Sequence, residues 1–116
     1  MILRGDIWLA DLDPRRGAEA DKHRPVVIVS NDGANAAAAR LDHGVVTVVP
    51  VTSRPGRVLP FQVLLAPPDS GLDLESKAQA EQVRSIDVVR LTRRLGRLSP
   101  SAAWQLDEAL RLHLAL

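Results

Sequence analysis

Two short runs of β-branched residues do most to limit the folds open to this chain. The first, Val26–Val29, follows Arg24-Pro25, and the second lies within GVVTVVPVTS, residues 44–53. Runs this short and this rich in valine predict strands, and an unbroken apolar run predicts a strand buried on both faces. Pro25 suits the first residue of a strand, and Pro50 predicts an edge or a bulge. The chain must therefore bury at least one strand completely.

Further strands are expected within residues 4–12, 60–66, 76–86 and 95–98. In RGDIWLADLD, polar and apolar residues alternate, and Asp13-Pro14 ends the pattern. SKAQAEQVRSI, residues 76–86, is polar but also alternates, so it is expected to be one half-exposed strand. The stretch PPDSGLDLES before it is expected to be a loop, and DVVRL after it a helical turn.

The end of the chain shows the clearest helix pattern. Ser99 is a favourable N-cap, and Pro100 suits the first helical position. The apolar face that follows recurs at steps of three and four, at Ala103, Leu106, Leu110 and Leu114. Asp107 and Arg111 have the spacing of an i,i+4 ion pair. A shorter helix is expected through GANAAAARL, capped by Asn31-Asp32.

Five to seven short strands, a small helix and a long terminal helix predict a β-rich α+β fold in which the strands form a partly open barrel. One domain is expected for 116 residues. The absence of cysteine excludes a disulfide scaffold and a thiolate metal site, and it suits the reducing cytosol. No apolar run approaches the roughly 20 residues that span a membrane, and the first residues lack the pattern of a signal peptide.

Neither charge nor histidine spacing identifies a ligand. The net charge is +1, and His23, His43 and His113 are scattered without metal-ligand spacing, so no metal or cofactor is expected. What remains is a set of polar residues near the ends of predicted strands: Glu19, His23, Arg24, Thr52, Ser53, Gln82 and Arg84. Taken singly, each is also compatible with an ordinary turn, a solvated loop or a sheet position.

As a group, these residues suit phosphate chemistry without a metal. Arginine presents a planar fork of N–H donors to the non-bridging oxygens of a phosphate. A threonine hydroxyl adds a donor, and a nearby glutamate or histidine can move a proton. RNA carries its own nucleophile, the 2′-OH. A protein therefore needs only to align this group, deprotonate it and stabilise the charge at phosphorus.

Six motifs in order then point to a family: RGDIWLADLDP at 4–14, GAEADKHRPVVIVSND at 17–32, VVPVTS at 48–53, PFQVLL at 60–65, AEQVRSID at 80–87 and LDEAL at 106–110. Over nearly the whole chain, their order and spacing resemble the MazF/PemK toxins of bacterial toxin–antitoxin pairs. The resemblance implies a small, curved, largely antiparallel barrel with a long C-terminal helix. This is the CcdB/MazF-like, SH3-like architecture, and it also implies a homodimer.

The resemblance further implies a cytoplasmic, metal-independent endoribonuclease that cuts single-stranded RNA at short sequences. The 2′-OH attacks the neighbouring phosphorus and leaves 2′,3′-cyclic phosphate and 5′-hydroxyl ends. The target is mRNA, tRNA or rRNA, and the result is growth arrest, which a cognate antitoxin prevents. Two alternatives stay open: a CcdB-like toxin that binds gyrase without nuclease activity, and an inactive module that only binds its antitoxin.

Residue by residue, the resemblance assigns Arg24 and Thr52 as the catalytic pair and Glu19 as a residue of proton transfer. Substrate binding is expected from His23, Ser53, Arg54, Gln82 and Arg84. The chain departs from the commonest family pattern at Asp21-Lys22, which bears on the motion of the loop and on the preferred RNA sequence.

The sequence leaves open which residue acts as the general base. Arginine stays protonated far above neutral pH, so Arg24 is expected to act mainly as an electrostatic clamp and secondarily as the acid for the leaving oxygen. Glu19 is the first hypothesis for the base and His23 the second. The ordinary pKa of a glutamate, about 4.3, must be raised for this task, whereas that of a histidine is about 6.5.

Two groups of arginines are expected to contact binding partners. Arg54 and Arg57, beside the Thr52 site, suit an acidic antitoxin arm that folds on the toxin. A second basic run either follows the RNA backbone or forms a solvated face, and it consists of Arg90, Arg93, Arg94 and Arg97.

Overall fold

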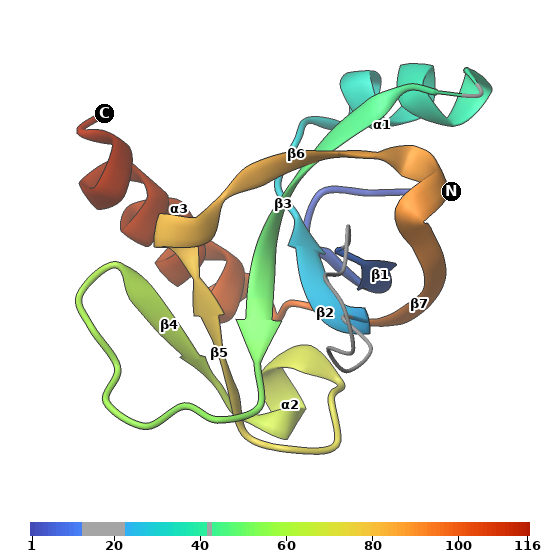
Figure 1. The fold of residues 1–116 in the computed structure, drawn as a ribbon. Helices are drawn as coiled ribbons and strands as arrows, with labels where there is room; N and C mark the ends of the chain where they lie inside the picture. The colour runs from blue at the N-terminus through green and yellow to red at the C-terminus, as the bar shows by residue number, and fades with distance from the viewer. Residues whose placement is uncertain (13–22, 42) are drawn as a thin grey trace, which may run out of the picture.

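Two valine-rich strands form the middle of the sheet. In this computed structural model, which describes residues 1–12, 23–41 and 43–116, β2 (His23–Ile28) and β3 (Val45–Thr52) lie side by side and antiparallel (Figure 1). Alternate side chains of β2 enter two apolar clusters: Val27 enters one, and Val26 and Ile28 the other. All three are fully buried, which confirms a strand covered on both faces. The strand begins at His23, so Pro25 is its third residue and not its first.

The sheet has seven strands and stays open. Their order is β4-β5-β3-β2-β1-β7, with β6 also pairing with β3. The other strands are β1 (Asp6–Asp11), β4 (Gln62–Leu65), β5 (Ser76–Gln79), β6 (Arg84–Asp87) and β7 (Leu91–Arg97). In the described part of the chain every pairing is antiparallel, and β4 and β7 do not pair with each other. The predicted β-rich α+β fold with a curved, open barrel is therefore confirmed.

Most predicted strand positions agree with the structure. The strands expected at 4–12 and 60–66 correspond to β1 and β4. The strand expected at 95–98 begins earlier, at Leu91, directly after the 3₁₀ helix η2 (Val88–Arg90), which is the predicted helical turn.

The polar stretch 76–86 forms two strands and not one. β3 pairs with β5 at Val51 opposite Ala78, and with β6 at Val48 opposite Arg84. Between these two pairs, β3 advances by three residues, whereas the chain that pairs with it advances by six, from Ala78 to Arg84. The 3₁₀ helix η1 (Ala80–Gln82) takes up the difference, so Gln82 lies on a helical turn. The prediction of one continuous strand is wrong, because alternation does not reveal a shift of register.

Pro50 lies inside β3 rather than on an edge strand. It faces Val26 of β2. On the other side of β3, the pairing with β6 stops at Val48 and the pairing with β5 starts at Val51. The residues of β3 between these two positions therefore have no ladder partner on that side among the described residues. A proline has no N–H to donate and is tolerated at such a gap. The irregularity that Pro50 predicts is thus the junction between two partner strands.

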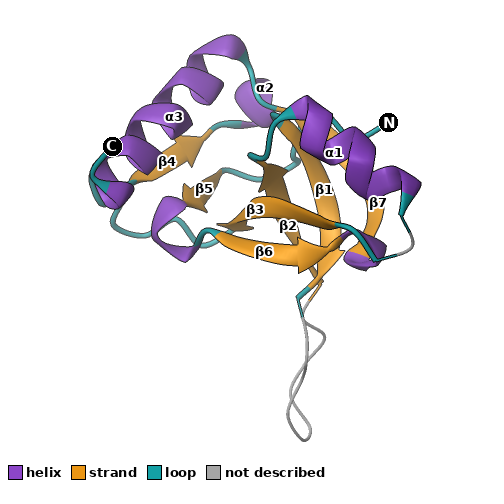
Figure 2. Ribbon diagram, turned by 90° about the horizontal axis from the view of Figure 1, so that it is seen from above, coloured by secondary structure: helices purple, strands orange, loops and turns teal. Residues whose placement is uncertain are grey.

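Three α-helices pack on the sheet in the described residues. α1 (Asp32–Arg40) begins as predicted, with the Asn31 side chain accepting the N–H of Ala34. α3 (Pro100–Leu114) is capped by Ser99 and lies along β4 (Figure 2), where it buries Ala102, Leu106, Ala109 and Leu110. The short α2 (Pro67–Ser70) occupies part of the stretch that was expected to be a loop. None of the described helices is long and apolar enough to cross a membrane.

The ion pairs on α3 differ from the one that helical spacing predicts. Asp107 accepts a hydrogen bond from Nη2 of Arg4 at 2.8 Å, and Arg111 pairs with Glu108 at 3.1 Å. Arg4 also donates to the carbonyl of Val29. The predicted Asp107–Arg111 pair is therefore wrong, because an arginine from the start of the chain reaches Asp107 from outside the helix.

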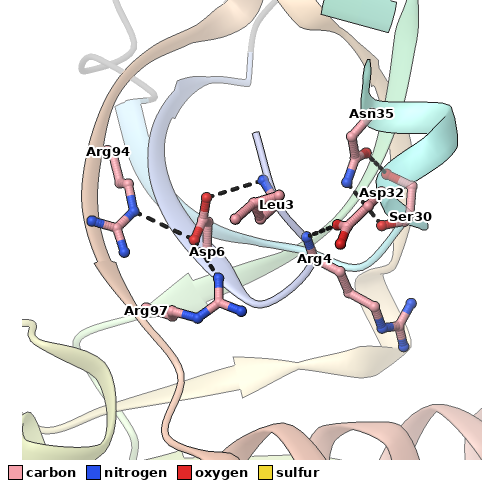
Figure 3. Close-up of polar contacts among 8 residues, drawn as sticks. All are labelled: Leu3, Arg4, Asp6, Ser30, Asp32, Asn35, Arg94 and Arg97. Atoms are coloured by element: carbon pink, nitrogen blue, oxygen red, sulfur yellow. Dashed lines mark hydrogen bonds and ion pairs between the residues drawn. The ribbon is translucent and has the colours of Figure 1, made fainter. Parts of the chain in front are cut away.

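A buried carboxylate engages part of the second basic run (Figure 3). Asp6 is 2% exposed and accepts hydrogen bonds from Arg97 Nη1 at 2.7 Å and from the Leu3 N–H at 3.0 Å. Nε of Arg94 lies 3.4 Å from the same carboxylate. Donors of this kind offset the cost of burying a charge. Arg90 donates to the carbonyl of Asp11 at 3.1 Å, so three of the four arginines in the run hold the edge of the sheet.

Candidate active site

Arg24 and Thr52 come together at the end of the two central strands. The pairing between β2 and β3 ends at Val26 opposite Pro50. If the same register continued for two more residues on each strand, Arg24 would lie opposite Thr52. Neither Pro25 nor Pro50 has an N–H, so the ladder loses donors at this point and the strands can part. Both predicted site residues therefore lie at an open end of the sheet.

A cavity of about 420 Å³ lies where the strands part. It is lined by His23, Arg24, Pro25, Val51, Thr52, Ser53, Arg54 and Ser76. Five of the predicted site residues, which come from two separate strands and the turn after β3, therefore share one cavity.

The described wall of this cavity is positively charged. Arg24 and Arg54 are both exposed, His23 lies beside them, and none of the described lining residues is a carboxylate. Two guanidinium groups at one opening provide forked donors for the oxygens of a phosphate. The net charge of +1 for the whole chain conceals this local concentration.

The hydroxyl proton of Thr52 is available for a hydrogen bond to a ligand. Its Oγ1 accepts the N–H of Arg54 at 3.3 Å, which is a long and weak hydrogen bond. A hydroxyl carries one proton as well as its lone pairs, so accepting this bond leaves the proton to be donated. Among the described residues, none accepts it. Thr52 can therefore act as a donor to a group that enters the cavity.

Three predicted site residues do not contribute to the described wall. Glu19 lies outside the described residues. Gln82 is the exposed last residue of η1, and Arg84 is the exposed first residue of β6. Because β6 pairs with the first half of β3, Arg84 lies back along that strand from Thr52. Their predicted contacts with substrate stay predictions.

Two residues of β5 lie in or beside the site although no pattern in the sequence indicates it. Ser76 is buried, donates to the carbonyl of Leu74 at 2.9 Å and forms part of the cavity wall. Lys77 lies opposite Thr52 and donates to the carbonyl of Arg57 at 2.9 Å. Alternation in SKAQ indicated a strand, but only the pairing of that strand with the end of β3 brings these residues to the site.

A second, larger cavity of about 610 Å³ contains none of the predicted site residues whose positions are described. Its apolar lining residues include Val29, Val83, Leu110 and Leu114, and the Arg4–Asp107 pair also lines it. A hollow that mixes apolar and charged side chains suits contact with protein.

Comparison with known proteins agrees with the fold. The chain is 60% identical to endoribonuclease MazF9 of Mycobacterium tuberculosis over 116 residues, which is 100% of this chain and 98% of that protein. A solved endoribonuclease from a mycobacterial species, in complex with its cognate antitoxin, matches with a TM-score of 0.77 and 26% identity, over 100% of this chain and 97% of that one. The Mycobacterium tuberculosis toxin MazF-mt6 matches with a TM-score of 0.75 and 29% identity, over 96% of this chain and 97% of that one.

The family match extends over almost the entire sequence. Residues 3–114 match the family described as the PemK-like, MazF-like toxin of type II toxin–antitoxin systems. The matched region contains β1 to α3 and every predicted site residue. This chain therefore belongs to the PemK-like, MazF-like toxin family.

Proposed function

We propose that this chain is a sequence-specific endoribonuclease toxin that cuts single-stranded RNA without a metal, as one toxin domain spanning residues 1–116. The observation that carries the proposal is the meeting of Arg24 and Thr52 at one positively charged cavity. The relative with 60% identity is named an endoribonuclease, which supports the class of reaction.

The proposed reaction uses the RNA's own hydroxyl as the nucleophile. The 2′-oxygen attacks the adjacent phosphorus while the bond from phosphorus to the 5′-oxygen breaks. A base takes the 2′-OH proton, and the leaving oxygen gains a proton, so the products are a 2′,3′-cyclic phosphate and a 5′-hydroxyl. Arg24 offers its fork to the non-bridging oxygens, and Thr52 adds a hydroxyl donor. Both stabilise the charge that develops on the phosphate.

The remaining predicted residues have supporting roles in this proposal. Glu19 is the first candidate for the base, and His23, which lies in the cavity wall, is the second. Ser53 and Arg54 bind the RNA backbone beside the reacting phosphate. Gln82 and Arg84 are proposed to contact nucleotides further along the strand.

The rival function is a toxin that binds gyrase and has no nuclease activity. A gyrase binder has no need of an arginine and a threonine hydroxyl at one phosphate-sized cavity. Two of the relatives named above are endoribonucleases, so the gyrase-binding function is not favoured.

A second copy of the chain is the proposed partner at the larger cavity. The end of the chain exposes apolar side chains: Leu112 and Leu114 on α3 are 58% and 47% exposed, and Leu116 after it is 84% exposed. Leu114 and Leu116 line the cavity. Covering them in a homodimer would remove apolar surface from water.

The proposed regulator is a cognate antitoxin. A solved relative is bound to its own antitoxin, and here Arg54 and Arg57 present exposed positive charge beside the cavity. An acidic arm paired with them would cover the entrance and exclude RNA. With such a partner and an RNA substrate, the protein would work in the cytoplasm.

The test is digestion of a long, mixed-sequence RNA in excess EDTA, followed by mapping of the new ends. We expect cuts at one short motif, with 5′-hydroxyl and 2′,3′-cyclic phosphate ends. Intact RNA, from folded protein that still arrests growth, would contradict the proposal and favour the gyrase-binding function.

A further inference from the structure

The segment that joins β3 to β4, residues 53–61, makes an unusual connection. β5 lies between these two strands and pairs antiparallel with both, so β3 and β4 run in the same direction. The chain leaves β3 at Thr52, beside the first residues of β5, and enters β4 at Gln62, opposite the last residue of β5. Such a crossover usually takes a dozen or more residues and contains a helix. This one contains neither a helix nor a strand, and it sweeps round the β4–β5 side of the sheet (Figure 1).

Most of residues 53–58 are exposed, whereas Leu59 and Phe61 at the end of the segment are half-buried and Phe61 packs on the His113 ring. Ser53, Arg54, Gly56, Arg57 and Val58 are all exposed. Its two ends are tied by hydrogen bonds to neighbouring residues, from the Arg54 N–H to Thr52 Oγ1 at 3.3 Å and from the Leu59 N–H to Gln62 Oε1 at 3.0 Å. An exposed connection with so few contacts tends to be mobile unless something fixes its middle.

Lys77 supplies that contact. Its position on β5, opposite Thr52 of β3 and Leu64 of β4, brings its side chain within reach of the crossing segment. Its Nζ donates to the carbonyl of Arg57 at 2.9 Å. Among the hydrogen bonds of the described residues, this is the one that ties the middle of the segment to the sheet.

We propose that Lys77 is a positioning residue for the RNA-cleaving site, which holds the β3–β4 segment so that Arg54 stays in the wall of the Arg24–Thr52 cavity. The inference rests on the proposed function, and it assigns Lys77 no contact with the reacting atoms. Its ammonium is already directed at a backbone carbonyl in the segment that carries Arg54. Loss of this contact should weaken RNA binding and leave the chemical step intact, because the Lys77 side chain bonds to the Arg57 carbonyl, and the backbone pairing of Lys77 with Thr52 is kept when only the side chain changes.

A double-mutant cycle tests this role through KM and kcat separately. Lys77→Met keeps the length of the side chain and removes the charge, and we expect it to raise KM about 5-fold with kcat within about 2-fold. In an Arg54→Ala background the same change should have no further effect on KM, since the arginine it positions is absent. Additive effects of the two changes would show that Lys77 meets RNA by itself, and would overturn the inference.

Backbone ¹⁵N relaxation of residues 56–59 provides a readout that needs no RNA. Lys77→Met should increase their nanosecond motion, and Lys77→Arg, which keeps a donor, should restore the order and the wild-type KM. Arg40→Met is the matched control, because it removes one positive charge at the end of α1, and both KM and relaxation should stay as in the wild type. Unchanged relaxation in Lys77→Met would overturn the inference even if the wild type cuts RNA. Increased motion in a protein that cuts no RNA would refute the proposed function and leave the anchoring contact standing.

Discussion

Replacing Arg24 with alanine is expected to lower the rate of RNA cleavage about 1,000-fold while leaving the fold intact. The guanidinium is the strongest donor for the charge that builds on the phosphate, and such preorganised donors are worth about 10²- to 10³-fold or more. Arg24 is exposed and makes no side-chain hydrogen bond or ion pair to the described residues, so the free energy of unfolding should change by less than about 0.5 kcal/mol. Single-turnover cleavage and urea unfolding measure the two effects.

Two further variants show whether the charge or the fork of Arg24 matters. Arg24→Lys keeps the charge but loses the paired N–H donors, so its rate should lie between those of the wild type and the alanine variant. Arg40→Ala removes an arginine from α1, at the far end of β3 from the cavity, and should cleave at the wild-type rate. An alanine variant at position 24 that retained a third of the wild-type rate would rule out Arg24 as the phosphate clamp.

Replacing Thr52 with valine is expected to lower kcat about 100-fold. Valine has nearly the same shape, so the change removes the hydroxyl donor and little else. One donor aimed at the reacting phosphate is worth about 10²-fold. The single described hydrogen bond that Oγ1 accepts is 3.3 Å long, so the loss of stability should be below about 1 kcal/mol.

The controls for this prediction come from the same strand and the same chemistry. Thr52→Ser keeps a hydroxyl and should recover most of the rate. Thr47→Val makes the identical change in the first half of β3, outside the Arg24–Thr52 cavity, and should leave kcat unaltered. Equal rates for Thr52→Val and the wild type would remove the hydroxyl from the mechanism.

The fold was predictable wherever a local signal decides the structure. Ser99-Pro100 and Asn31 begin helices because capping involves only neighbouring residues. The break between β5 and β6 depends instead on how two strands match β3, and nothing in SKAQAEQVRSI records that register. The prediction of an Asp107–Arg111 ion pair was wrong for a related reason, since Arg4, from a distant part of the chain, pairs with Asp107 instead.

The site was predictable in part. From the residues alone, Arg24 and Thr52 were polar groups near strand ends, and the resemblance to a toxin family assigned them to one reaction. The register of β2 and β3 supplies the physical reason, because it leads the two residues toward each other as the ladder ends. Lys77 could not be found in this way, since its contact with Arg57 arises only where the chain crosses β5.

The proposed mechanism requires the cavity to align the RNA's own 2′-OH for attack on the neighbouring phosphorus. It is tested most directly with an RNA of the cleaved sequence that carries a single 2′-deoxyribose on the 5′ side of the scissile phosphate, incubated with the wild type in EDTA. We predict that this RNA binds within about 3-fold of the all-ribose RNA, because one hydroxyl adds little to a mainly electrostatic contact, and that it is not cut at that position. Cleavage at the deoxy position would refute the proposed mechanism, because another nucleophile would then have to attack the phosphorus.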